Sequence, residues 1–122
     1  MVVLIADDSE FIRNNLSKLL KTSETIEEVY VAKTVKESIE LMNAVQPDVL
    51  VLDIKFPDGM GFEVLDAAKS KKEKPPVVFI FTNYPFDHYK SRSYNGGADY
   101  FFDKSADYDK IFDAIEKLNP LK

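Results

Sequence analysis

The sequence contains no cysteine and only one histidine, His88. Without cysteine the chain forms neither disulfides nor thiolate metal sites, a composition compatible with a reducing compartment, and we expect the protein to be cytoplasmic. Nothing in the sequence places His88 beside Asp7, Asp8 or Asp53, so we expect its side chain to be exposed at the surface.

Positive charge and long apolar runs are also scarce. The chain has 16 Lys and Arg against 21 Asp and Glu, a net charge of −5. A chain of this charge repels nucleic acids and anionic membranes, which argues against a general binder of either. The N-terminal stretch "MVVLIA" stops at Asp7, short of the apolar region of a signal peptide, and no run approaches the ~20 apolar residues that span a bilayer. We expect a soluble protein.

The apolar residues that are present lie in short runs. Three continuous runs rich in β-branched residues, "VVLIA", "VLVL" and "VVFIF", are typical of strands covered on both faces of a parallel sheet. Two shorter runs of mixed polarity, "EEVYVA" and "DYFF", suit the edges of the same sheet. The predicted strands span residues 2–6, 27–32, 49–52, 77–81 and 99–102.

The segments between these strands carry helical spacing. Apolar residues recur at i, i+4, i+7 and i+8 from Ile12, and Thr34 with Glu37 forms a capping-box pattern ahead of the second helix. The fourth helix, residues 86–95, is polar and weakly patterned, and we expect the glycine pair that follows to end it, because glycine readily adopts a left-handed backbone. We interpret the charged run at residues 69–74 as the solvated end of the third helix.

These patterns predict one domain, residues 1–122, because a chain of this length with 45% hydrophobic residues suffices for one core. Five strands alternating with five helices favour an α/β fold, a flavodoxin-like doubly wound parallel sheet with strand order 2-1-3-4-5. In such sheets the functional site forms beyond the carboxyl ends of the strands, where the winding direction reverses. The first and third strands are neighbours at that point.

Polar residues follow four of the predicted strands. Asp7 and Asp8 follow the first strand and Asp53 the third, whereas Thr82 follows the fourth and Lys104 lies two residues after the fifth. An aspartate after a strand often only caps a helix or a turn. All five residues, however, fall at one edge of the predicted sheet, which favours a common role.

Three carboxylates at one edge repel one another, and the usual remedies are proton sharing or a divalent cation. Ligands that are all oxygen point to a hard ion, Mg²⁺ above all, which keeps waters and a phosphate oxygen among its ligands. A cation beside Asp53 would let its carboxylate attack phosphorus and form an acyl phosphate. Thr82 would then hydrogen-bond one phosphoryl oxygen, and Lys104 would pair with another.

Four segments, "IADDSEF", "VLVLDIKFPDGMGFEVL", "VFIFTN" and "GADYFFDKS", resemble in order the motifs of the receiver domain of two-component response regulators. The resemblance implies that Asp53 accepts phosphate from a phosphohistidine on a sensor histidine kinase or a histidine phosphotransfer protein. It also implies that Mg²⁺ is held by the carboxylates of Asp7, Asp8 and Asp53 and by the backbone carbonyl of Lys55. Such a domain is a signalling module rather than an enzyme, catalyses only its own phosphorylation and dephosphorylation, and controls a downstream protein partner.

The resemblance further implies a switch, in which Thr82 moves toward the phosphoryl group and Phe101 turns into the vacated space. The face formed by the fourth helix, the fifth strand and the fifth helix would change with them. Ser105 stands where the family usually has proline, so we expect the loop after Lys104 to differ. Asn83 replaces a small residue and is expected to narrow access for the phosphate donor.

The sequence is compared with three other interpretations by what each would require of it. A phosphatase of the haloacid dehalogenase type also uses an aspartyl nucleophile, but it needs a second aspartate two residues further on, where this sequence has Lys55. We expect Lys55 and Tyr84 to flank the phosphate instead. A pseudo-receiver that serves only for docking would not need to keep Asp53, Thr82 and Lys104. The chain is alternatively the N-terminal receiver fragment of a larger response regulator, and its last residues, "NPLK", fit a natural end or the start of a linker.

Overall fold

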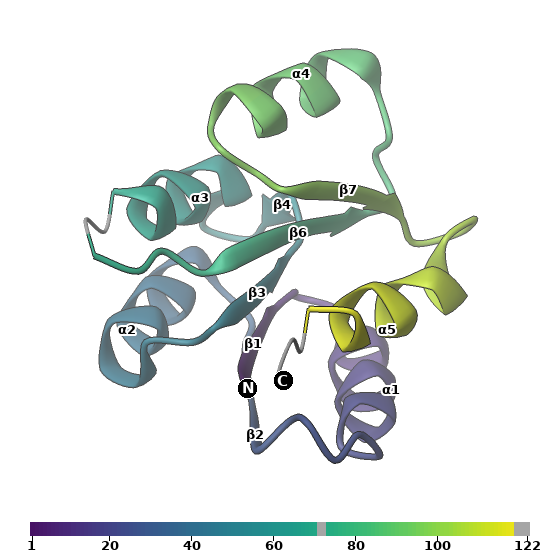
Figure 1. Cartoon of the computed structure of the whole chain (residues 1–122). Coiled ribbons are helices and arrows are strands. Elements are labelled where there is room, and N and C mark those ends of the chain that lie inside the picture. The colour runs from purple at the N-terminus through teal and green to yellow at the C-terminus, as the bar shows by residue number, and fades with distance from the viewer. Residues whose placement is uncertain (71–72, 119–122) are drawn as a thin grey trace.

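Five parallel strands of the described chain form a central sheet in the order β2-β1-β3-β6-β7 (Figure 1). They are β1 (Val2–Ala6), β2 (Glu28–Ala32), β3 (Val49–Leu52), β6 (Val77–Thr82) and β7 (Tyr100–Asp103). Counted within this sheet alone, the order is 2-1-3-4-5. The predicted doubly wound α/β fold is therefore confirmed.

The computed structural model describes residues 1–70 and 73–118. The predictions for the middle of the charged run and for the final segment "NPLK" concern residues outside this part. Lys69, the first residue of the run, is half-buried rather than solvated, because its Nζ donates to the Pro76 carbonyl and to Asp99 Oδ2, each at 2.8 Å. Among the helices of the described residues, none is long and apolar enough to cross a bilayer.

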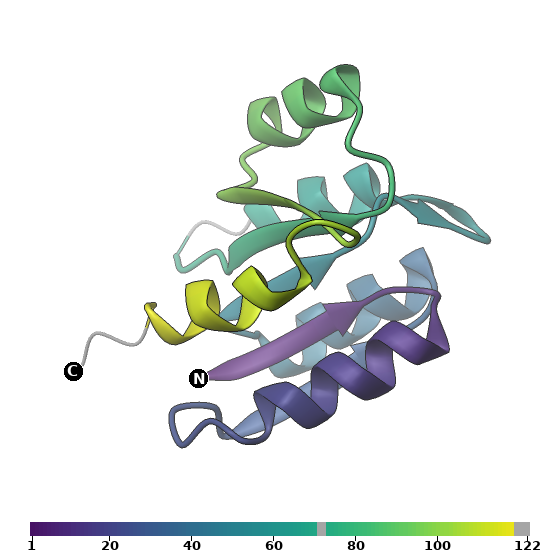
Figure 2. The same ribbon diagram turned by 90° about the vertical axis from the view of Figure 1, so that its right-hand side faces the viewer.

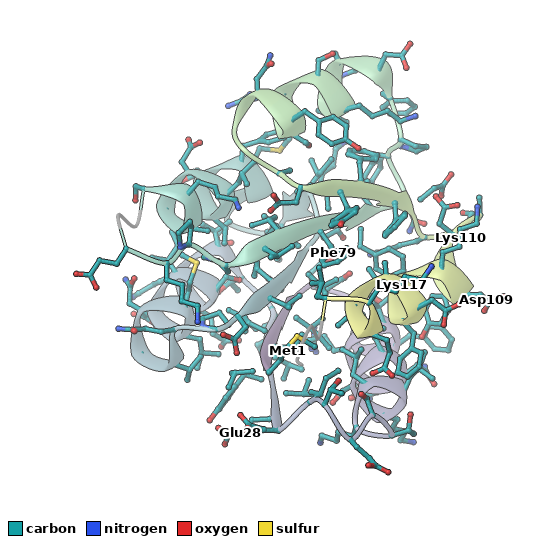
Figure 3. The ribbon with its side chains drawn as sticks, in the orientation of Figure 1. Met1, Glu28, Phe79, Asp109, Lys110 and Lys117 are labelled. Atoms are coloured by element: carbon teal, nitrogen blue, oxygen red, sulfur yellow. The ribbon has the colours of Figure 1, made fainter. Side chains whose placement is uncertain are left out.

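Helices cover both faces of the sheet. Within the described ranges they are α1 (Glu10–Leu20), α2 (Val35–Val45), α3 (Gly61–Lys69), α4 (Asp87–Asn95) and α5 (Tyr108–Glu116). Figure 2 shows α1 and α5 in front of the sheet and α2 and α3 behind it. Alternate residues of β1 follow this division, because Val3 and Ile5 pack with α1 and α5, whereas Leu4 and Ala6 pack with α2 and α3. Phe79 of β6, labelled in Figure 3, belongs to the core on the α1 and α5 side.

The ends of the helices follow the sequence signals closely. Thr34 Oγ1 accepts a hydrogen bond from the Glu37 N–H at 3.0 Å, which confirms Thr34 as the N-cap of α2. Glu37 Oε1 accepts its bond from the Lys33 N–H, at 2.9 Å, and not from the Thr34 N–H of a complete capping box. After α4, Gly96 keeps a right-handed backbone and Gly97 takes the left-handed one, with φ of 101°. The glycine pair therefore ends the helix as predicted, and the second glycine supplies the unusual conformation.

A short antiparallel hairpin follows β3 and was not predicted. Its strands β4 (Lys55–Phe56) and β5 (Gly59–Met60) have two residues each, too few to carry a periodic signal. In its turn, the Asp58 carboxylate accepts hydrogen bonds from the N–H groups of Val35 at 2.8 Å and Lys36 at 3.1 Å. These bonds, the one from Val35 above all, lower the pKa of Asp58 and attach the hairpin to the start of α2.

Helix α3 begins directly after the hairpin at Gly61, which packs very closely against the end of β3. The Gly61 N–H donates to the Ile54 carbonyl, and a Cβ atom at position 61 would lie 2.0 Å from the backbone oxygen of Asp53. Only glycine fits this approach without displacing the backbone. The residue is therefore needed for space, not for a left-handed conformation.

Candidate functional site

The carboxyl ends of β1 and β3 bring the three predicted aspartates together. The two strands pair with Ala6 opposite Leu52, so the residues that follow them are neighbours. One carboxylate oxygen from each of Asp7, Asp8 and Asp53 lies within 4.8 Å of the other two. Asp7 and Asp53 are buried and Asp8 is exposed. Oxygen donors in this arrangement suit a hard divalent cation, and Asp8 keeps one side of the cluster open to solvent.

Lys104 lies between the two buried carboxylates. Its Nζ is 2.7 Å from Asp7 Oδ2 and 2.9 Å from Asp53 Oδ2. The other oxygen of each carboxylate accepts a backbone hydrogen bond, Asp7 Oδ1 from the Ser9 N–H at 2.9 Å and Asp53 Oδ1 from the Ile54 N–H at 2.7 Å. Each buried carboxylate thus has a charged partner and a backbone partner, which offsets part of the cost of its burial.

Burial and charge shift the titration of this cluster. Burial and the neighbouring Asp53 charge raise the pKa of Asp7 to about 6, although Lys104 acts in the opposite direction. Burial of Lys104 disfavours its charged form, but the charges of Asp53 and Asp7 outweigh this effect and raise the pKa of Lys104. The Lys104 ammonium group therefore stays charged at neutral pH. Keeping the buried Asp7 carboxylate ionised at the same pH costs free energy.

Ionisation of Asp7 is expected to lower the stability of the metal-free protein. The folded-state pKa of about 6 lies above the ordinary value of 3.8, so the stabilising proton is fully bound below 3.8 and is lost as the pH rises through about 6. The loss amounts to roughly 3 kcal/mol. Urea unfolding in EDTA at a series of pH values would show wild type losing stability relative to Asp7→Asn over this range. Parallel curves for the two proteins would contradict the assignment.

Thr82 ends β6 and is fully buried. Its Oγ1 accepts a hydrogen bond from the Tyr84 N–H at 3.2 Å, and its carbonyl accepts one from the Lys104 N–H at 2.9 Å. The hydroxyl is thus held by the backbone of the following loop. The structure places Thr82 at the same edge of the sheet as the aspartates, as the sequence predicted.

A hollow of about 270 Å³ lies over Asp53. Across it, Lys55 on the hairpin and Tyr84 on the loop after β6 meet, with Lys55 Nζ 4.3 Å from the centre of the Tyr84 ring. The sequence led us to expect that both residues flank the phosphate, but nothing in it indicated that they touch each other. The lining residues are Asp8, Ser9, Asp53, Lys55, Phe56, Pro57, Asn83, Tyr84 and Lys104.

Three further residues of the sequence analysis have a defined place. His88 is exposed on α4, as predicted, and its ring packs 4.3 Å from that of Tyr89, centre to centre. Phe101 on β7 is half-buried, with Lys90 Nζ 5.8 Å from its ring centre. Ser105 is exposed, and the peptide bond that joins it to Lys104 is trans.

Comparison with known proteins agrees with this geometry. A sequence profile described as "Response regulator receiver domain" matches residues 3–116. The sensory transduction protein LytT of Enterococcus faecalis is 32% identical over 119 residues, which cover 98% of this chain and 48% of that protein. The transcriptional regulatory protein LytR of Staphylococcus aureus is 31% identical over 122 residues, 100% of this chain and 48% of the relative. The chain thus spans about half the length of these relatives.

Solved structures give the same result for the fold. A DNA-binding response regulator of the LuxR family from Staphylococcus aureus superposes with a TM-score of 0.86 at 24% identity, covering 97% of this chain and 98% of that one. A CheY-like response regulator receiver domain protein from Methanospirillum hungatei superposes with a TM-score of 0.84 at 25% identity, covering 96% of this chain and 92% of that one. Since the profile match covers nearly the whole chain, this protein belongs to the response regulator receiver domain family of two-component signal transduction.

Proposed function

We propose that residues 1–122 form one receiver domain that accepts a phosphoryl group on Asp53 from a phosphohistidine of a sensor kinase or phosphotransfer protein. The observation that carries this proposal is the convergence of three carboxylates and Lys104 at the ends of β1 and β3. The pairing of these two strands brings Asp53 together with Asp7 and Asp8, whereas Lys104 enters from the end of β7.

The donor set fits Mg²⁺. Three carboxylates with oxygens within 4.8 Å of one another include one exposed group, so a partly hydrated ion has access. The carboxylates of Asp7, Asp8 and Asp53 and the backbone carbonyl of Lys55 would hold the ion. Bound there, Mg²⁺ would supply charge neutralisation for the oxygens of the transferring phosphoryl group.

Each side chain of the site has its own role in the transfer of the phosphoryl group. A carboxylate oxygen of Asp53 attacks phosphorus, the P–N bond of the phosphohistidine breaks, and the histidine nitrogen keeps the electron pair. Lys104, which pairs with Asp53 at 2.9 Å before transfer, stays within reach of a phosphoryl oxygen afterwards. The Thr82 hydroxyl would exchange its bond with the Tyr84 N–H for one to the phosphoryl group.

Output is proposed to follow from the same exchange. Movement of Thr82 would open space that the half-buried Phe101 fills, and this would alter the face formed by α4, β7 and α5 for a downstream protein partner. The chain spans about half the length of the relatives LytT and LytR. We propose that it acts either alone or as the receiver domain of a longer regulator. Asn83 and the Lys55–Tyr84 contact would limit the size of the phosphate donor.

The direct test is labelling by acetyl phosphate. In the presence of Mg²⁺, the intact mass of the protein is expected to increase by one phosphoryl group, and hydroxylamine should remove it because acyl phosphates are sensitive to this nucleophile. EDTA should prevent labelling. A wild-type protein that stays unlabelled would contradict the proposal and would favour a domain that only docks, and continuous release of inorganic phosphate from unrelated phosphate esters would favour a phosphatase.

Replacing Asp8 with alanine is expected to weaken Mg²⁺ binding by about tenfold or more, because the cluster loses its solvent-exposed ligand. Isothermal titration calorimetry of wild type and Asp8→Ala would measure the change. Glu10→Ala provides a matched control, since Glu10 is also exposed and acidic but lies outside the cluster. Equal affinities for wild type and Asp8→Ala would place the ion elsewhere.

A further inference from the structure

Two aspartates close the turn that carries Lys104. The Asp103 N–H donates to Asp107 Oδ2 at 2.9 Å, and the Asp107 N–H donates back to the Asp103 carbonyl at 2.7 Å. The Ser105 N–H donates to Asp103 Oδ1 at 2.8 Å. Three hydrogen bonds therefore define five residues of backbone, and two of the bonds use a carboxylate as the acceptor.

The same turn is joined to the sheet beside the site. Asp103 is the last residue of β7 and pairs with Thr82 of β6. The next residue, Lys104, donates its N–H to the Thr82 carbonyl at 2.9 Å. The backbone of Lys104 is thus fixed by the sheet on one side and by the turn on the other. Its long side chain has no rigid shape of its own, so this anchor sets which groups the ammonium can reach.

No proline in residues 103–107 restricts this backbone. Ser105 stands where a proline would fix φ, and it offers an N–H that proline lacks. We propose that Asp103 and Asp107 are positioning residues, whose carboxylates close the turn and hold Lys104 against Asp53 and Asp7. The inference rests on the proposed function, because it assigns the turn a role in phosphoryl transfer to Asp53. Both aspartates lie outside the acidic cluster of the described structure.

Two substitutions of Asp107 distinguish the effect of its negative charge from the effect of its hydrogen bond. The bond from the Asp103 N–H above all lowers the pKa of Asp107, and Lys110 Nζ lies 3.2 Å from the other carboxylate oxygen. Lys110 and Asp109 lie in the first turn of α5 (Figure 3). Asparagine at position 107 keeps an oxygen for the Asp103 N–H but loses the charge, whereas alanine loses both. A hydrogen-bonding role therefore predicts rescue by asparagine.

The experiment compares Asp107→Ala, Asp107→Asn and the control Asp109→Ala. Asp109 is exposed, and the structure records no side-chain hydrogen bond for it in the described ranges. The first readout is the NMR signal of the Lys104 ε-methylene, identified by its loss in Lys104→Met. We expect it to move toward the position of solvent-exposed lysines in Asp107→Ala and to stay near the wild-type position in the other two variants. The second readout is the labelling rate with saturating acetyl phosphate and Mg²⁺, expected to fall roughly tenfold in Asp107→Ala alone.

The outcomes separate the two proposals. A folded Asp107→Ala, verified by circular dichroism, that keeps both the Lys104 signal and the wild-type rate would overturn the positioning role, as would an asparagine variant as impaired as the alanine variant. If wild type fails to label but the Lys104 signal depends on Asp107, the proposed function fails and the positioning role stands. Should Asp107→Ala not fold, Asp103→Ala removes the Ser105 bond, leaves the start of α5 unchanged and is judged by the same two readouts.

Discussion

Replacing Asp53 with asparagine is expected to abolish phosphorylation by acetyl phosphate while the domain stays folded. The amide has no nucleophilic oxygen comparable to a carboxylate, but its carbonyl oxygen can still accept the hydrogen bond from the Ile54 N–H. Lys104 keeps its partner Asp7 at 2.7 Å, so no buried charge is left unpaired. Intact-mass measurement under labelling conditions would show no phosphoryl adduct, and thermal unfolding would show a cooperative transition.

The control for this variant is Asp66→Asn, because Asp66 is an exposed aspartate of α3. It should label at the wild-type rate. If Asp53→Asn labels as fast as wild type, another residue is the acceptor, and peptide mapping of the adduct would identify it.

Replacing Gly61 with alanine is expected to destabilise the protein by about 3 kcal/mol, the upper range for a methyl group forced into a packed interior. The new Cβ would stand 2.0 Å from the backbone oxygen of Asp53, so either the start of α3 or the end of β3 must move. A shift of the end of β3 would displace the Asp53 carboxylate, which we propose as the phosphate acceptor. Urea unfolding should show the loss, and Mg²⁺ affinity should fall with it.

Gly96→Ala provides the matched control for this prediction. Its added Cβ would lie 2.8 Å from Cδ2 at the far end of the Leu65 side chain and 3.3 Å from the Arg92 backbone oxygen, and Gly96 already has a right-handed backbone. The same chemical change should therefore cost less at position 96 than at position 61. Equal losses in the free energy of unfolding at the two positions would show that the contact with the Asp53 backbone oxygen does not cause a larger destabilisation.

The parts of the molecule that the sequence predicted share a physical basis. Continuous apolar runs identify buried parallel strands, and parallel strands deliver the residues that follow them to one edge. For this reason, the closeness of Asp7, Asp8 and Asp53 could be predicted although Asp53 lies 45 positions after Asp8 in the sequence. The helices were predicted correctly between the strands because their apolar residues recur at the spacing that buries one helix face against the sheet.

The features that escaped prediction lie in the connections. The hairpin after β3, the bonds of Asp58 to α2 and the Lys55–Tyr84 contact depend on side chains that meet across loops. Neither composition nor periodicity encodes such encounters, since each is set by the path of two separate loops. Lys69 shows the same limit, because its partner Asp99 lies 30 positions away and turns an apparently solvated lysine into a half-buried one.

The ion pairs of Lys104 also bear on the valence of the ion that would suit the proposed metal site. With all groups ionised, three carboxylates and one ammonium group leave two negative charges around the cluster. A doubly charged ion brings this assembly to electroneutrality, whereas Na⁺ leaves an excess of negative charge and a trivalent ion overshoots. In the proposed metal site, Lys104 would thus act as a built-in counter-ion that favours a divalent ion over a monovalent or trivalent one.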